Sequence, residues 1–149
     1  MSRARRLADE AIEKYAIMSG DFALSSGARS DTYVDCRAAM LKDQAAFSLY
    51  LWEELNRYRN AAPVATGTSG ALMLGLIGWG YLWNPKGHGV EWSPRPAKGT
   101  SVVLFDDVVT THGTLDRLRA ACEAAGLVVA GEVVLYDRRE KASGVDRRP

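Results

Sequence analysis

Apolar residues recur at helical spacing in two stretches of the N-terminal part of the chain. Residues 3–18 form an amphipathic pattern with charges between the apolar positions, and Gly20 is predicted to end this helix. A second helix is expected from Asp43, a suitable N-cap, to about Tyr58, because its apolar residues form one stripe. Between the two helices, residues 22–37 hold short apolar runs on either side of a Ser-Gly-Ala turn, which predicts a β-hairpin.

The rest of the chain alternates between apolar strands, polar loops and helices. Strands are predicted at 62–65, 101–105 and 127–136, and helices at 71–79 and 115–125. The segment 84–99 is rich in Gly and Pro without periodicity, so we expect an exposed, mobile loop there. This order of elements predicts βαβ units, and therefore an α/β fold with a parallel sheet and right-handed crossovers. A chain of 149 residues is expected to form a single domain, 1–149.

Composition argues against several classes of protein. Nineteen Lys and Arg residues balance eighteen Asp and Glu residues, whereas nucleic-acid-binding proteins gather a basic excess. The apolar run 71–79 is too short to span a bilayer, and the N-terminal arginines are followed by acidic residues rather than by the apolar core of a secretory signal. Cys36 and Cys122 lack metal-ligand spacing and are expected to be reduced thiols in the cytoplasm. The charged tail, 137–149, is expected to fray.

Two polar loops, each between a predicted strand and a predicted helix, carry candidate chemistry. Both are built from small and hydroxyl residues: Thr66, Gly67, Thr68, Ser69 and Gly70 in the first, and Thr110, Thr111, His112, Gly113 and Thr114 in the second. Ligands of open α/β sheets bind at such loops, where backbone amides and hydroxyls can surround an anion. Neither loop has a Walker or dinucleotide-binding pattern, and together they indicate a ligand with two phosphate groups. The alternative is that each loop is only a tight turn.

Two adjacent carboxylates, Asp106 and Asp107, follow the apolar strand 101–105. Neighbouring carboxylates repel each other and are poor strand residues, so a packing role does not explain them. The favoured interpretation is that they hold a polyhydroxylated ligand or its Mg²⁺. The alternative is a helix cap beside a surface charge.

The stretch 105–114 resembles the phosphoribosyl-pyrophosphate (PRPP) motif of type I phosphoribosyltransferases. Three further segments are similar to segments of the orotate phosphoribosyltransferases, and they follow in that family's order: Phe22-Ala-Leu-Ser-Ser-Gly27 with Tyr33-Val34-Asp35, Lys86-Gly-His-Gly89, and Asp137-Arg138. The resemblance implies a type I phosphoribosyltransferase fold, with helices flanking a parallel sheet. It also implies a small N-terminal hood at about residues 20–37 and a mobile catalytic loop at 84–99.

The resemblance further implies a reaction, in which the ribose 5-phosphate of PRPP passes to orotate and yields orotidine 5′-monophosphate and pyrophosphate. Asp106 and Asp107 would bind the ribose hydroxyls and steady Mg²⁺, which is held through PRPP. Residues 110–114 would bind the 5′-phosphate and residues 66–70 the pyrophosphate. In a homodimer with shared sites, the neighbouring subunit would close over the leaving pyrophosphate with Lys86 and His88. The hood and base-binding residues would be Ser25, Tyr33, Val34 and Arg138.

The chain departs from the family's pattern in three places. His112 stands where the family has Gly, and an Arg-Lys pair before Lys86 is replaced among Leu82, Trp83 and Asn84. The chain also ends soon after residue 139, without the family's closing strand and helix. These departures keep two alternatives open: transfer to a base other than orotate, and a non-catalytic PRPP-binding or regulatory protein.

Overall fold

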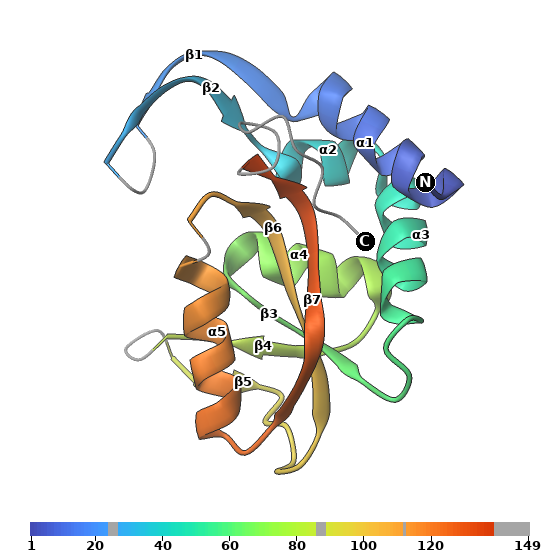
Figure 1. The fold of residues 1–149 in the computed structure, drawn as a ribbon, viewed down its shortest axis with the longest axis vertical. Coiled ribbons are helices and arrows are strands. Elements are labelled where there is room, and N and C mark those ends of the chain that lie inside the picture. The colour runs from blue at the N-terminus through green and yellow to red at the C-terminus, as the bar shows by residue number, and fades with distance from the viewer. Residues whose placement is uncertain (24–26, 86–88, 112, 139–149) are drawn as a thin grey trace.

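A five-stranded sheet and a separate two-stranded hairpin make up the β-structure of the described part of the chain (Figure 1). The computed structural model describes residues 1–23, 27–85, 89–111 and 113–138. The elements follow in the order α1 (Arg3–Tyr15), β1 (Ile17–Ala23), β2 (Arg29–Val34), α2 (Cys36–Lys42), α3 (Gln44–Leu55), β3 (Ala62–Thr66), α4 (Gly67–Ile77), β4 (Tyr81–Trp83), β5 (Trp92–Ser93), β6 (Ser101–Val109), α5 (Gly113–Ala124) and β7 (Val128–Asp137).

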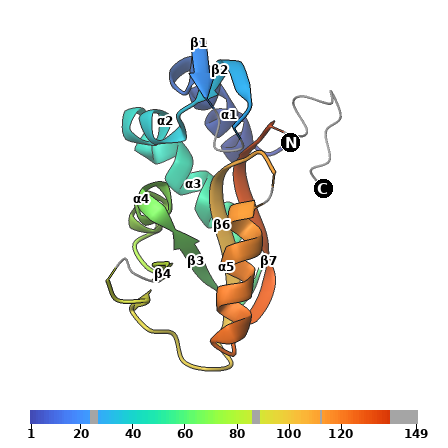
Figure 2. The ribbon, with the colours of Figure 1, turned by 90° about the vertical axis from the view of Figure 1, so that its left-hand side faces the viewer.

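The larger sheet has the strand order β5-β4-β3-β6-β7, in which β4, β3, β6 and β7 run parallel and β5 runs antiparallel to β4. Helix α4 connects β3 to β4, and α5 connects β6 to β7. The predicted α/β fold with a parallel sheet is therefore confirmed. Figure 2 shows α5 in front of β6 and β7, with α3 and α4 on the other side of the sheet.

Strand β6 lies at the centre of the core because both of its faces are covered. Val103 and Phe105 pack in a cluster with residues of α1, α2, α3 and α4, while Val102 and Leu104 pack against Leu118 of α5. This alternation is the period of two that a strand imposes on its side chains. All four β6 side chains are at most 1% exposed. Truncating a buried leucine such as Leu104 to Ala typically costs about 2–5 kcal/mol of stability.

The N-terminal helix ends earlier than its apolar spacing predicts. Helix α1 stops at Tyr15, and β1 begins at Ile17 and continues through Gly20, so the prediction that Gly20 ends the helix is wrong. The reason is strand pairing: Ile17 lies opposite Val34 in the antiparallel β1–β2 hairpin. The hairpin itself was predicted, although it starts five residues before the expected position at 22. It stands apart from the larger sheet in Figure 1.

Helix α3 begins as predicted, because the Asp43 carboxylate accepts a hydrogen bond from the amide of Ala46 at 3.2 Å. It ends at Leu55 rather than near Tyr58. The short helix α2, capped by Asp35, was not predicted. Within the described ranges, no helix is both long enough and apolar enough to span a bilayer.

The segment predicted as an exposed loop, 84–99, is partly ordered into the sheet. Strand β4, which precedes it, pairs with β5 inside it, and Trp92 of β5 is only 3% exposed. Asn84 closes the connection, since its amide and its side chain donate to the carbonyls of Glu91 and Val90 at 2.7 and 2.8 Å. The prediction of a fully exposed loop is therefore wrong around Trp92, whose packing against β6 and α5 residues no local pattern reveals.

Candidate functional site

A pocket of about 640 Å³ opens where β6 and β7 end, between the start of α5 and the β1–β2 hairpin. It brings together most of the described candidate residues from both ends of the chain. Its lining is formed by Ala23, Tyr33, Val34, Asp106, Asp107, Val108, Val109, Thr110, Thr111, Gly113, Thr114, Arg117 and Arg138. The PRPP-motif segment and the hairpin, which are distant in sequence, therefore face one cavity.

The two carboxylates lie within β6 rather than after it. The strand was predicted to end at Phe105 but continues to Val109, because β7 pairs with it along this stretch, with Asp106 opposite Val134 and Val108 opposite Tyr136. The Asp106 carboxylate also accepts the amide of Asp107 at 2.9 Å, which fixes its orientation. Both acids are half-buried and line the pocket, as the functional interpretation requires.

A thiol lies close to these carboxylates, on the side of the buried core. Burial raises the pKa of the Cys36 thiol far above its usual range, and the negative charges of Asp107 and Asp35 raise it further. A thiol under these conditions stays protonated at neutral pH. Cys36 is therefore a packing residue beneath the pocket, as expected for a buried reduced thiol, and not a nucleophile.

The second polar loop leads directly into α5, which starts at Gly113, two residues before the predicted position. Thr110, Thr111, Gly113 and Thr114 all border the pocket. The first amides of a helix have no intrahelical partner and carry partial positive charge, so this end of the pocket suits an anion. His112 lies outside the described residues.

The first polar loop is mostly not a loop, which corrects that prediction. Helix α4 starts at Gly67, so Thr68, Ser69 and Gly70 form its first turn instead of preceding it. Gly70 is needed for packing, because a Cβ there would lie 2.9 Å from the Cβ of Ala65. The hydroxyl of Thr66 donates to the carbonyl of Trp83 at 2.7 Å.

None of residues 66–70 borders the 640 Å³ pocket. They nevertheless occupy the same edge of the sheet. Val64 pairs with Leu104, so that Thr66, two residues further along β3, is level with Asp106 on the parallel strand β6. The prediction that this segment binds pyrophosphate stays a prediction.

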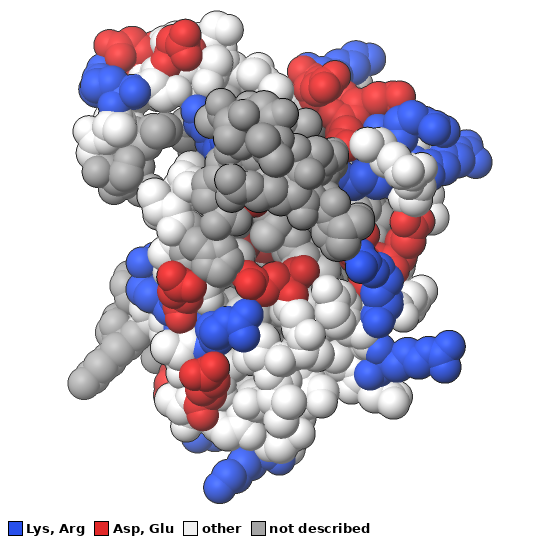
Figure 3. All heavy atoms as spheres, in the orientation of Figure 1, with Lys and Arg blue, Asp and Glu red and all other residues white. Residues whose placement is uncertain are grey.

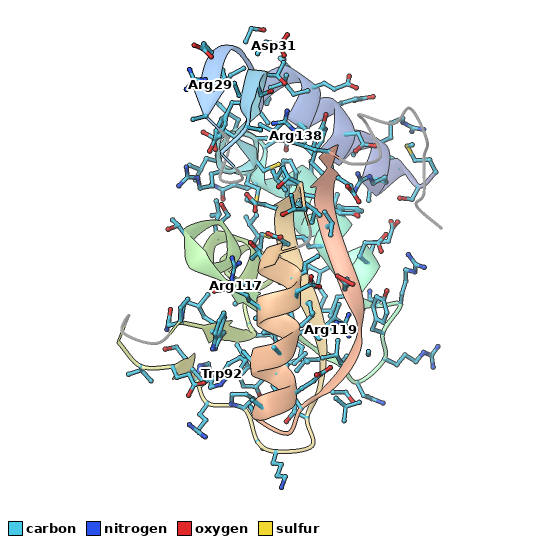
Figure 4. The ribbon with its side chains drawn as sticks, turned by 60° about the vertical axis from the view of Figure 1, so that its left-hand side comes forward. Arg29, Asp31, Trp92, Arg117, Arg119 and Arg138 are labelled. Atoms are coloured by element: carbon cyan, nitrogen blue, oxygen red, sulfur yellow. The ribbon has the colours of Figure 1, made fainter. Side chains whose placement is uncertain are left out.

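Arg138, at the end of β7, reaches across to the hairpin (Figure 4). Its Nη2 donates to the hydroxyls of Ser30 and Thr32 at 3.1 and 3.3 Å, and its Nη1 donates to the Thr32 carbonyl at 3.4 Å. On the same hairpin the rings of Phe22 and Tyr33 lie 5.4 Å apart. One wall of the pocket therefore combines an aromatic side chain, Tyr33, with a guanidinium.

Comparison with known proteins shows which family this chain belongs to. No family model matches the chain. The orotate phosphoribosyltransferase of Aeropyrum pernix is 36% identical over 141 residues, which cover 85% of this chain and 75% of that protein. The chain belongs to the orotate phosphoribosyltransferase family.

Solved structures of phosphoribosyltransferases have the same fold. The crystal structure of the Aeropyrum pernix orotate phosphoribosyltransferase matches with a TM-score of 0.65 at 30% identity, over 93% of this chain and 89% of that one. The Mycobacterium tuberculosis orotate phosphoribosyltransferase in complex with PRPP matches with a TM-score of 0.64 at 20% identity, over 95% and 91%. The type I phosphoribosyltransferase fold implied by the sequence motifs is thus confirmed.

Several residues singled out by the resemblance to orotate phosphoribosyltransferases lie outside the described residues: Ser25, Lys86 and His88. The positions expected to carry the family's Arg-Lys pair are described. Leu82 and Trp83 are half-buried in β4, and both pair with β5. Side chains that pack in a sheet cannot replace two phosphate-binding cations.

Arg117 is a pocket residue that the sequence did not reveal. The PRPP motif ends at Thr114, and an arginine in the next turn of a helix is typical of any solvated helix face. The available signal was its spacing of three residues from Thr114, which puts both side chains on one face of α5.

On the face shown in Figure 3, basic and acidic side chains are interspersed. Arg117 and Arg138, by contrast, both line the pocket. The positive charge of the described pocket lining therefore comes from two individual residues, and the face shown carries no extended basic surface of the kind that binds nucleic acids.

Proposed function

We propose that this chain transfers the ribose 5-phosphate of PRPP to orotate, giving orotidine 5′-monophosphate and pyrophosphate. The observation that carries the proposal is that one pocket combines three kinds of group. The same cavity is lined by the carboxylate pair on β6, by residues with hydroxyls and amides at the start of α5, and by Arg138, which follows β7 and is hydrogen-bonded to the hood. They match the sugar hydroxyls, the 5′-phosphate and a carboxylated base, respectively.

The sugar and phosphate would be held by the PRPP motif. Asp106 and Asp107 accept hydrogen bonds from the ribose 2′- and 3′-hydroxyls in this proposal, and the segment from Thr110 to Thr114 surrounds the 5′-phosphate. These contacts fix the reacting carbon, which carries positive charge in an oxocarbenium-like transition state. The nearby carboxylates favour that charge, which is electrostatic rather than covalent catalysis.

The residues present fit a magnesium ion that is held mainly by substrate. Among the described residues there is no cluster of three or more metal-ligating side chains. Mg²⁺ is commonly bound by one or two carboxylates together with substrate phosphates, a need that Asp106 and Asp107 can meet. When bound, the ion would neutralise charge on the departing pyrophosphate.

The base would lie beneath the hood. Tyr33 and Val34 offer apolar surface for the pyrimidine ring, and the guanidinium of Arg138 offers a partner for the orotate carboxylate. From the sequence motif, we propose that Lys86 and His88 of the neighbouring subunit in a homodimer close over the pyrophosphate and exclude water. Cytoplasmic location is part of the same proposal.

A second candidate function is binding of PRPP without catalysis. The observation that favours it is that Leu82 and Trp83 are half-buried in β4 and that neither they nor Asn84 supplies the two cations of the family pattern. Such a protein would keep the PRPP motif but lack charge on the leaving group. Transfer to another base is the third candidate, and it depends on the residues around Tyr33.

Turnover with PRPP, Mg²⁺ and a panel of orotate, uracil and adenine separates the three candidates. We expect pyrophosphate release above background with orotate and with neither of the other two bases. Turnover with a different base would support the alternative enzyme. Calorimetric binding of PRPP with no turnover of any base would support the non-catalytic protein, and absence of PRPP binding would contradict all three.

A further inference from the structure

Arg117 folds back toward the start of its own helix. Its Nη2 lies 3.4 Å from the hydroxyl of Thr114, to which it donates. A Cβ placed on Gly113 would lie 3.5 Å from Nη1 of Arg117 and 3.7 Å from the hydroxyl oxygen of Thr111. The guanidinium and the Thr111 hydroxyl thus border the space that the absent side chain of Gly113 leaves, and Thr114 lies beside it.

Among the residues that the structure describes, no carboxylate forms an ion pair with Arg117. Between described residues, the ion pairs of α5 include Arg119 with Glu132 at 3.2 Å but none of Arg117. Figure 4 shows the two arginines on different sides of α5, with Arg119 directed toward β7. A guanidinium near the positive end of a helix is unfavourable unless an anion lies beside it. The position of Arg117 is therefore suited to a bound anion.

Groups of opposite polarity line the pocket. Asp106 and Asp107 present acceptors, which suit the hydroxyls of a sugar. Arg117 and the threonine hydroxyls at the start of α5 present donors. A terminal phosphate monoester carries nearly two negative charges and three acceptor oxygens, which a guanidinium matches geometrically.

We propose that Arg117 binds the 5-phosphate of PRPP as an additional phosphate ligand, beyond the hydroxyls and amides of the PRPP motif. This inference rests on the proposed function, since it assumes a phosphorylated sugar in this pocket. Arg117 also orients the phosphate, because the fork of an arginine fixes direction as well as charge.

The test measures binding of ribose 5-phosphate by calorimetry to the full chain, with competition by inorganic phosphate. Three variants are compared with the wild type: Arg117→Gln, Arg117→Lys and, as the matched control on the same helix, Arg119→Gln. We expect Arg117→Gln to raise the Kd for ribose 5-phosphate about tenfold. This change lies at the low end of the range for hydrogen bonds to charged groups, because the site is exposed. Arg117→Lys should recover part of the loss, and Arg119→Gln should bind like the wild type.

The outcomes separate this inference from the proposed function. Wild-type affinity in Arg117→Gln would overturn the inference and leave the proposed function standing. Equal loss in Arg117→Gln and Arg119→Gln would also overturn it, because the effect would then come from the helix. A wild-type protein that binds neither ribose 5-phosphate nor PRPP would contradict both.

Discussion

Arg138 and Thr32 are 106 residues apart in sequence, yet the Arg138 guanidinium donates both to the carbonyl of Thr32 and to its hydroxyl, at 3.4 and 3.3 Å. Together with the bond to Ser30, these contacts tie the end of the core sheet to the hairpin. The hairpin otherwise stands apart from the larger sheet in Figure 1. The same arginine that is proposed to meet the base therefore also holds the hood in place.

Replacing Arg138 should loosen the hood without unfolding the core. Arg138→Met removes these hydrogen bonds. If they stabilise the closed hairpin by about 1 kcal/mol, their loss raises the population of the open hairpin, and so the exchange rate of its amides, about fivefold. Hydrogen exchange of the backbone amides measures this opening. The control is Arg29→Gln, which removes the exposed ion pair with Asp21, of little energetic value. Equal exchange in wild type and Arg138→Met would show that the hood is held by other contacts.

Replacing Asp106 and Asp107 together by Asn should abolish PRPP binding and leave the fold intact. The two carboxylates line the pocket, and each charge-assisted bond to a ribose hydroxyl contributes about 1.5–3 kcal/mol. Calorimetry with PRPP and Mg²⁺ measures the loss, and circular dichroism checks the fold. Asp31→Asn, an exposed carboxylate on the hood, is the control. The assignment fails if the double variant binds PRPP as the wild type does.

Replacing Lys86 by Ala should lower kcat far more than it weakens ground-state binding of PRPP. The proposed function has Lys86 close over the leaving group, so its contact would form mainly on closure. An interaction made in the transition state lowers kcat and kcat/KM together. A raised KM with unchanged kcat would show a binding role only. If sites are shared between subunits, mixing Lys86→Ala with the Asp106 and Asp107 double variant should restore some activity.

The buried thiol of Cys36 should make stability depend on alkaline pH. Burial first, and the charge of Asp107 next, raise the pKa of Cys36 in the folded protein, whereas the unfolded thiol ionises near its ordinary value. The sign follows directly, because above that value the unfolded state loses a proton that the folded state keeps, so stability falls as pH rises. One thiol contributes a loss of about 1 kcal/mol between pH 9 and pH 10.

Urea unfolding of the wild type and of Cys36→Ala at both pH values measures this effect, and the difference between the two proteins isolates Cys36 from other groups. Cys122, whose pKa burial raises to about 11, remains in both proteins and cancels in the comparison. The same pH dependence in wild type and Cys36→Ala would contradict the prediction.

The parts of the fold that could be predicted are those with strong local patterns. The apolar run that precedes Asp106 identifies β6, and Asp43 identifies the start of α3. The acid pair and the hydroxyls after it were assigned to one site because the stretch 105–114 resembles the PRPP motif. The pocket around Asp106 and Thr110 agrees with that assignment.

The parts that could not be predicted depend on contacts between distant residues. Gly20 has the character of a helix stop, but it lies in a strand because β2 pairs with β1. Gly70 has the character of a loop residue, but it packs in the first turn of α4 against Ala65. The only local signal for Arg117 is its spacing of three residues from Thr114, and the folded chain is needed to show that its guanidinium turns back to Thr114 and lines the pocket.

The central claim is that the pocket between the PRPP motif and the hood transfers a phosphoribosyl group to orotate. The most direct measurement is a paired time course of pyrophosphate and orotidine 5′-monophosphate, with PRPP, orotate and Mg²⁺, for the wild type and for the Asp106 and Asp107 double variant. We predict that the two products form in equal amounts with the wild type and that neither forms with the variant. Equal product formation by the variant, or pyrophosphate release without orotidine 5′-monophosphate, would contradict the claim.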